Sequence, residues 1–196
     1  MEVTLFGIVT LVRPVRPLNA EPTMLATGIL LLLVHALAAV SGRAVREWLR
    51  NFPRNREAGV VLALVAGAWF FFLVQKMDLG DFDTWRNTVL IGTPLATALA
   101  IMFIPDFLAV RALGVCALLA AEPLLESAFL RPENIRLLLV VLTYVWIVLG
   151  MFWVGMPYTL RDQIGWVSAS EKRWRAAAFA GLAYGALLVA GGLLVA

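Results

Sequence analysis

Five ionisable residues lie within or at the ends of long apolar stretches of the chain, and they are the side chains with which this sequence could do chemistry. They are Asp106, Arg111, Glu122, Glu126 and His35. An ionisable side chain is costly to place in lipid, so its presence in an apolar segment suggests a functional site. The set offers carboxylates for proton or cation exchange, a guanidinium for binding an anion and an imidazole for proton transfer.

Helical spacing places three charged residues, Arg111, Glu122 and Glu126, on one face of the predicted helix. Arg111 and Glu122 are eleven positions apart, which is almost three turns, so their side chains share a face at a separation of about 16 Å. Glu122 and Glu126 are one turn apart, at about 6 Å. This face predicts a polar path, with Arg111 holding an anion and the two glutamates handling protons or a cation.

A structural role for the same residues competes with the polar path and is favoured by their positions. Asp106 and Glu122 would be the two hydrated ends of a short span, with Asp106 capping the helix N-terminus. Arg111 would extend back to the lipid headgroups at the inner surface. His35 is expected to hydrogen-bond a neighbouring helix, and proton relay is the alternative.

The elements that carry these residues are predicted to be transmembrane helices. Of the 196 residues, 62% are hydrophobic and 15% are charged, whereas a soluble domain has about 25% charged residues. A run of about 18 or more apolar residues can cross the hydrocarbon core as a helix. Two stretches exceed this length, three of 16 or 17 residues come close to it, and a sixth, at 107–121, is shorter. The six are 24–40, 59–74, 89–104, 107–121, 135–156 and 176–196. The sequence therefore predicts an all-α, polytopic transmembrane helical bundle of about six spans.

Two features of this bundle stay open. The third and fourth stretches are short and joined by almost no chain, so they form either two full spans or a re-entrant hairpin that places Asp106 at membrane depth. Residues 1–23 are expected to be a short N-terminal segment outside the cytoplasm, followed by a single transmembrane domain at 24–196. Met24 is an alternative start of the protein.

Basic residues are concentrated in two of the connections between the predicted helices. Residues 41–58 hold five arginines, and residues 157–175 hold four basic side chains. Cytoplasmic loops carry an excess of lysine and arginine, so both connections are assigned to the cytoplasm. The chain is therefore expected in the cell membrane as a multi-pass protein with both termini outside.

One of these connections has the pattern of an amphipathic helix. Its apolar residues fall on a single helical face and arginines occupy much of the rest. The apolar residues are Val45, Trp48, Leu49 and Phe52. Such a segment is expected to lie along the inner leaflet as an anchor, and a docking surface for an acidic partner is the alternative.

Two spacings concern the last helix. Ser168 and Glu171 have the separation of a capping box, which predicts that the helix starts near Ala169. Gly181 and Gly185 form a G-x-x-x-G spacing, which predicts close packing of two helices, either within the chain or with another subunit.

Composition also limits the chemistry. With one cysteine and one histidine, the chain can form neither an internal disulfide nor, by itself, an iron–sulfur or bis-histidine haem site. It contains no H-E-x-x-H, G-x-S-x-G or P-loop pattern. No cofactor, no bound metal and no nucleic-acid partner is expected.

These observations favour a non-catalytic scaffold or accessory subunit of a membrane assembly. Its expected partners are the lipid bilayer and other membrane proteins or further copies of the chain. The alternative is a carrier or channel for ions or small solutes, with a polar path along the fourth span. An enzyme ranks third, because it would need Asp106, Glu122 and Glu126 to converge on one pocket.

Overall fold

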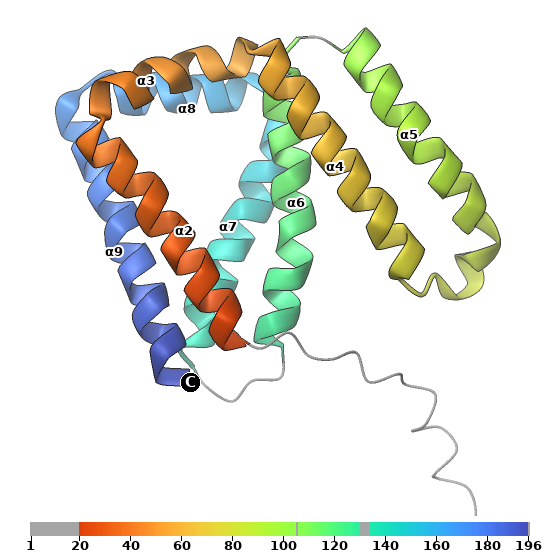
Figure 1. Ribbon diagram of the computed structural model, residues 1–196. Helices are drawn as coiled ribbons and strands as arrows, with labels where there is room; N and C mark the ends of the chain where they lie inside the picture. The colour runs from red at the N-terminus through yellow and green to blue at the C-terminus, as the bar shows by residue number, and fades with distance from the viewer. Residues whose placement is uncertain (1–19, 105, 130–133, 196) are drawn as a thin grey trace, which may run out of the picture.

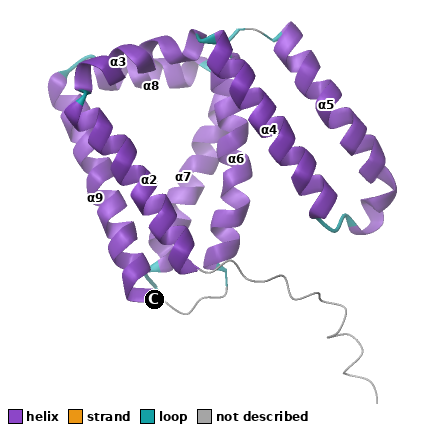
Figure 2. Cartoon of the chain, viewed as in Figure 1, coloured by secondary structure: helices purple, strands orange, loops and turns teal. Residues whose placement is uncertain are grey.

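The computed structural model describes residues 20–104, 106–129 and 134–195, and all regular secondary structure within these ranges is helical (Figure 2). Six of the helices are long and apolar enough to cross a membrane. They are α2 (Ala20–Val40), α4 (Arg56–Lys76), α5 (Arg86–Phe103), α6 (Leu108–Ala128), α7 (Arg136–Gly155) and α9 (Glu171–Val195). The predicted all-α fold with six span-length helices is confirmed.

Two shorter helices lie across one end of the six long ones (Figure 1). They are α3 (Gly42–Asn51) and α8 (Tyr158–Ser168), which contact each other side by side. We call this pair the platform and the end that carries it the platform end. The described chain ends, Ala20 and Val195, both lie at the opposite end. So does the 3₁₀ turn η2 (Gly80–Trp85), which joins α4 to α5.

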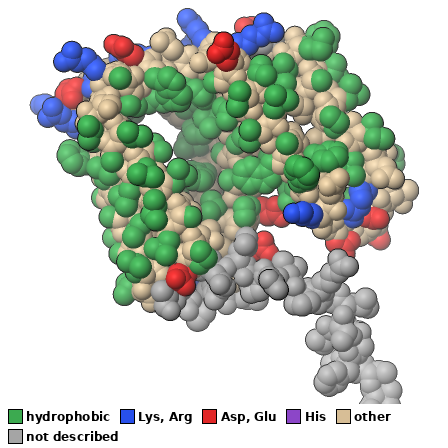
Figure 3. Space-filling view, in the orientation of Figure 1, with side chains coloured by type: hydrophobic (Ala, Val, Ile, Leu, Met, Phe, Trp, Pro, Cys, Tyr) green, Lys and Arg blue, Asp and Glu red, His purple; other side chains and the backbone are tan. Residues whose placement is uncertain are grey.

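The long helices form two groups that meet at the end opposite the platform. Helix α2 packs along α9, and α6 packs against both α7 and α4. A buried cluster joins the groups, made of Met24, Leu124, Leu139 and Leu188. Toward the platform α2 and α9 diverge from α6, and the space-filling view is hollowed between them (Figure 3).

The platform is fixed to the bundle by its own hydrophobic contacts. Phe52, in the 3₁₀ turn η1 (Phe52–Arg54) after α3, packs in one buried cluster with Leu160 of α8 and with Ala109 and Val110 of α6. The amphipathic helix predicted in the first basic connection is therefore present as α3. Helix α8 was not predicted.

Helices α5 and α6 do not form a re-entrant hairpin, so this alternative is wrong. Each has the length of a span, and their connection lies at the platform end rather than halfway along the bundle (Figure 1). Helix α5 packs mainly on α4, which it follows through the turn η2. Helix α6 also extends to Ala128, beyond the predicted end at residue 121, so Glu122 and Glu126 belong to its last turns.

The predicted capping box is also wrong. Ser168 is the last residue of α8, and α9 begins at Glu171. The Ser170 carbonyl accepts the first bond of α9 from the Trp174 N–H. The Ser168 hydroxyl and the Glu171 carboxylate instead bind arginines, because α3 lies within reach of both.

Residues 1–19 lie outside the described residues, and with them most of the predicted N-terminal segment. Residues 20–23 of that segment form the first turn of α2. The placement of residues 1–23 outside the cytoplasm thus remains a prediction.

Candidate functional site

The five ionisable residues singled out from the sequence lie at three separate places. Asp106 and Arg111 are at the platform end, Glu122 and Glu126 are in the last turns of α6 at the opposite end, and His35 lies against α9. Among the described residues, none of the five bonds to another of them. The structure therefore does not assemble them into a single polar site.

Arg111 binds the end of a neighbouring helix. Its Nη1 donates to the carbonyl of Val154, in the last turn of α7, at 2.6 Å. The last carbonyls of a helix have no partner within the helix, and a cation there also interacts favourably with the negative end of the helix dipole. The Nε of Arg111 is buried and has no hydrogen-bond partner among the described residues. Arg111 thus closes one helix end and keeps unused donors.

A long apolar groove begins at Arg111 and runs between α4, α5 and α6. Its volume is about 540 Å³, and Arg111 is the one charged side chain among the described residues that line it. Most of its wall is made of small side chains, among them Ala63, Ala66, Gly92, Ala96 and Ala100. Small side chains at these positions leave the space between the three helices unfilled, and the close approach of α5 to α4 is at Gly67 and Thr97.

The hydroxyl groups of the groove do not add an anchoring point for a polar ligand. Thr93 donates to the carbonyl of Val89 and Thr97 donates to the carbonyl of Thr93, both within α5. Threonine hydroxyls in helices commonly satisfy themselves in this way. The polarity of the groove is therefore concentrated at Arg111.

Asp106 does not cap α6, contrary to the sequence-based expectation. The N-cap position is Phe107, whose φ of 57° is left-handed, and no side chain caps the helix there. Phe107 packs with the buried cluster beneath the platform, and this contact offsets an unfavourable backbone conformation. Asp106 itself is exposed and has no bonded partner in the described part of the chain.

The two glutamates of α6 do not form a buried pair. Glu122 is exposed and Glu126 is half-buried. Neither has an ion-pair partner among the described residues. Both lie in the last two turns of α6, near the end of the bundle opposite the platform.

His35 takes part in a close contact between α2 and α9. Its Nδ1–H donates to the carbonyl of Leu31, one turn earlier in α2, at 2.8 Å, so the expected hydrogen bond to a neighbouring helix is wrong and the bond stays within its own helix. Its ring occupies the space in which Gly181 of α9 would carry a Cβ atom. One turn later, a Cβ at Gly185 would stand 3.0 Å from the carbonyl oxygen of Gly28. Both glycines of the G-x-x-x-G spacing therefore serve a helix contact inside this chain, between α9 and α2.

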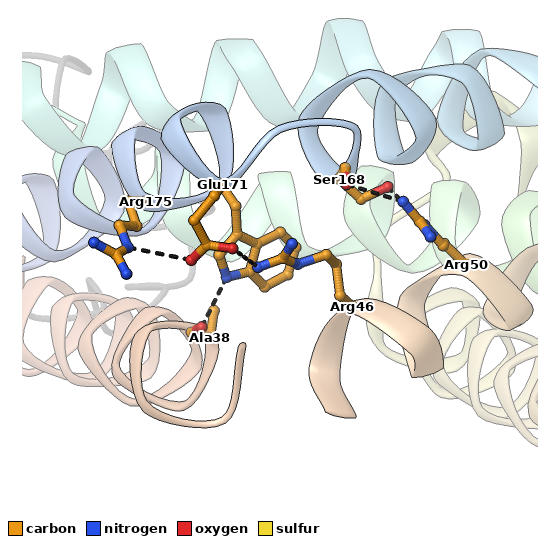
Figure 4. A network of polar contacts seen from close by, with 7 residues as sticks. Ala38, Arg46, Arg50, Ser168, Glu171 and Arg175 are labelled. Carbon is orange, nitrogen blue, oxygen red and sulfur yellow. Dashed lines mark hydrogen bonds and ion pairs between the residues drawn. The ribbon is translucent and has the colours of Figure 1, made fainter. Parts of the chain in front are cut away.

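The most extensive polar network lies at the platform end and ties α3 to α8 and α9 (Figure 4). Arg46 donates to Glu171 at 2.6 Å, and Arg175 donates to the other oxygen of Glu171 at 3.1 Å. Arg50 donates to both the hydroxyl and the carbonyl of Ser168, each at 2.9 Å. The network thus joins the two basic connections of the chain.

Trp174 adds a second layer to this network. Its indole N–H donates to the carbonyl of Ala38, near the end of α2, at 2.9 Å. The guanidinium of Arg46 lies 5.0 Å from the centre of its ring, a cation–π distance. The side chain of Arg46 is 18% exposed, so this cation is held between Trp174 and Glu171 and is largely removed from solvent.

Sequence reasoning missed this network. It assigned Ser168 and Glu171 to a helix cap and the arginines to lipid. The partners lie more than one hundred positions apart in the chain, at 125 for Arg46 with Glu171.

Within the described residues, no group of three or more His, Cys, Asp or Glu side chains could hold a metal ion. Comparisons with protein-family models, with curated proteins and with solved structures find no match to this chain. Function must therefore be argued from the geometry.

Proposed function

We propose that this chain is a multi-pass membrane protein that acts as a scaffold or accessory subunit of a larger membrane assembly. One observation carries the proposal. In the described residues, every charged side chain of the six long helices that makes a hydrogen bond does so at a helix end or in the platform network. Charges used in this way hold the structure together.

Three arginines illustrate this use of charge at helix ends. Arg86 donates to carbonyls at the end of α4, including that of Val74 at 2.9 Å. Arg136 donates to the carbonyl of Ala128, the last residue of α6, at 2.7 Å. Arg111 serves α7 in the same way. Such bonds satisfy the last carbonyls of a helix, which have no partner within the helix.

The distribution of charge supports a membrane orientation with the platform in the cytoplasm. The two arginine-rich connections form the platform end, and the described chain ends lie opposite (Figures 1 and 3). By the positive-inside rule the platform then faces the cytoplasm and both termini face outward. Exposed Trp48 and Trp166 on the platform suit the headgroup layer of the cell membrane.

Helix α5 supports a role as a subunit. None of its residues is buried, and it packs mainly on α4. Its outer face is apolar and exposed, with Ile91 at 72% and Leu95 at 59% of their full accessible areas. Helices in lipid associate through van der Waals packing, so a peripheral helix with one main neighbour offers a face for a second membrane protein.

The test is site-specific photo-cross-linking of the full chain in its own membrane. A photoreactive amino acid at Leu95 on α5 is compared with one at Leu33, an exposed position on α2. We expect a defined protein adduct from position 95 and none from position 33. Native mass spectrometry of gently extracted protein should then show the same partner at fixed stoichiometry.

A contrary result would favour the carrier hypothesis. It would be a chain that runs alone in native mass spectrometry, with no protein adduct from position 95. Solute flux in proteoliposomes that is lost in both Arg111→Ala and Glu122→Gln would then assign transport to the polar residues of α6.

A further inference from the structure

The groove between α4, α5 and α6 combines an apolar channel with one cation at its end. It lies on the inner side of α5, away from the face assigned to a protein partner, and it does not depend on that assignment. We propose that this groove binds one acyl chain of an anionic phospholipid, with the lipid phosphate on Arg111.

The length of the groove fits an acyl chain. Its lining on α5 runs from Val89 to Ile104, a rise of about 22 Å along the helix. One leaflet contributes about half of a hydrocarbon core that is about 30 Å thick. A chain whose headgroup lies at the platform end therefore runs its full length inside the groove.

The volume of the groove fits a single small ligand. It is about 540 Å³, and sites of about 300–1,000 Å³ are the usual size for small molecules. One acyl chain is a ligand of this class.

The charge at the platform end selects an anionic headgroup. A guanidinium has five N–H donors, and Arg111 uses one of them, on Val154. Its side chain lines the groove, and no acidic side chain pairs with it among the described residues. A phosphate group accepts two parallel hydrogen bonds from a guanidinium. A zwitterionic headgroup offers the same phosphate but brings a competing ammonium.

The test uses the full chain in nanodiscs that contain equal amounts of phosphatidylglycerol and phosphatidylcholine. Native mass spectrometry after partial lipid release counts the lipids that stay bound. Wild type should retain one phosphatidylglycerol with at least a tenfold preference. Arg111→Gln should reduce this preference at least fivefold. Gly92→Leu should reduce retention similarly, because it fills the groove where no other atom lies within 4 Å of the new Cβ.

Two matched controls separate this site from general lipid contact. Arg161→Gln removes an exposed arginine of the platform, and Ala186→Leu places a leucine at an exposed position of α9. Both should retain the lipid as wild type does. Gly92→Leu leaves the Arg111 bond to α7 intact, so it tests the groove even if Arg111→Gln unfolds.

Two results would overturn the proposal. The first is an unchanged preference for phosphatidylglycerol in a folded Arg111→Gln or Gly92→Leu protein, which would mean annular lipid. The second is a protein adduct, rather than a lipid adduct, from a photoreactive residue at position 92. Neither result bears on the partner at position 95, so the two proposals can fail separately.

Discussion

At the scale of single residues, Gly181 and Gly185 of α9 lack a side chain where atoms of α2 lie, and so they allow the two helices to approach closely. The imidazole of His35 lies where Gly181 has no side chain, and the ring is oriented by its bond to the Leu31 carbonyl. Packing of this closeness is the main source of helix association in lipid, where apolar side chains gain little by leaving the solvent. His35 therefore takes part in the packing of α2 against α9.

Substituting Gly181 with alanine should destabilise the protein. The new Cβ overlaps the His35 ring, and overpacking of this kind costs about 1–3 kcal/mol. The free energy of unfolding, measured by denaturant titration in micelles, should fall by that amount. In Gly181→Ala combined with His35→Ala the penalty should be smaller than the sum of the single effects, because the clash is removed.

Gly92→Ala provides the control for this prediction, because its Cβ meets no atom within 4 Å. It should leave the stability nearly unchanged. Equal effects of alanine at positions 181 and 92 would show that the α2–α9 contact is not as close as described.

Residue types were easier to predict from the sequence than their partners. Arg111 was recognised as unusual because it interrupts an apolar stretch. Its partner is the backbone carbonyl of Val154, and a carbonyl has no signature in a sequence. The helical face shared by Arg111 and Glu122 likewise says nothing about which neighbouring helix covers each residue.

At the scale of elements, the platform is a pair of surface helices held to each other by ion pairs and hydrogen bonds. Exposed ion pairs contribute about 0–1 kcal/mol each, and Glu171 is half exposed. The bonds of Arg50 differ, because they reach the buried Ser168. Arg50 should therefore matter more to the platform than the Arg46–Glu171 pair does.

Replacing Arg50 with alanine should loosen α3. The loss of two charge-assisted hydrogen bonds leaves Ser168 without these donors and should cost about 1–2 kcal/mol. Hydrogen–deuterium exchange of residues 42–54 should become faster, while exchange in α2 and α9 stays slow. Arg43→Ala is the matched control, since Arg43 is exposed and makes no bond within the described residues. Identical exchange in the two variants would exclude an anchoring role for Arg50.

The long helices could be predicted from the sequence because a long apolar run is by itself enough to indicate a span-length helix. Helix α8 could not. Its inward residues Leu160 and Ile164 are separated by polar and charged positions, and they form a face only once α3 and α6 lie beneath them. The capping box failed because a serine and a glutamate at that spacing serve equally well as acceptors for arginines from another helix.

At the scale of the whole molecule, the two groups of helices meet at one end and are bridged by the platform at the other. This arrangement follows from the placement of the buried clusters, one around Leu139 far from the platform and one around Phe52 beneath it. The central proposal is that such a bundle crosses the membrane six times with the platform in the cytoplasm.

The most direct measurement is the labelling of single cysteines in intact cells with a membrane-impermeant maleimide. Cys116 is replaced by alanine, and Asp81→Cys in the η2 turn is compared with Arg173→Cys at the start of α9; both positions are exposed. We predict that Asp81→Cys reacts in intact cells, whereas Arg173→Cys reacts only after the cells are permeabilised. Reaction of both in intact cells, or the reverse pattern, would contradict the six-span arrangement with a cytoplasmic platform.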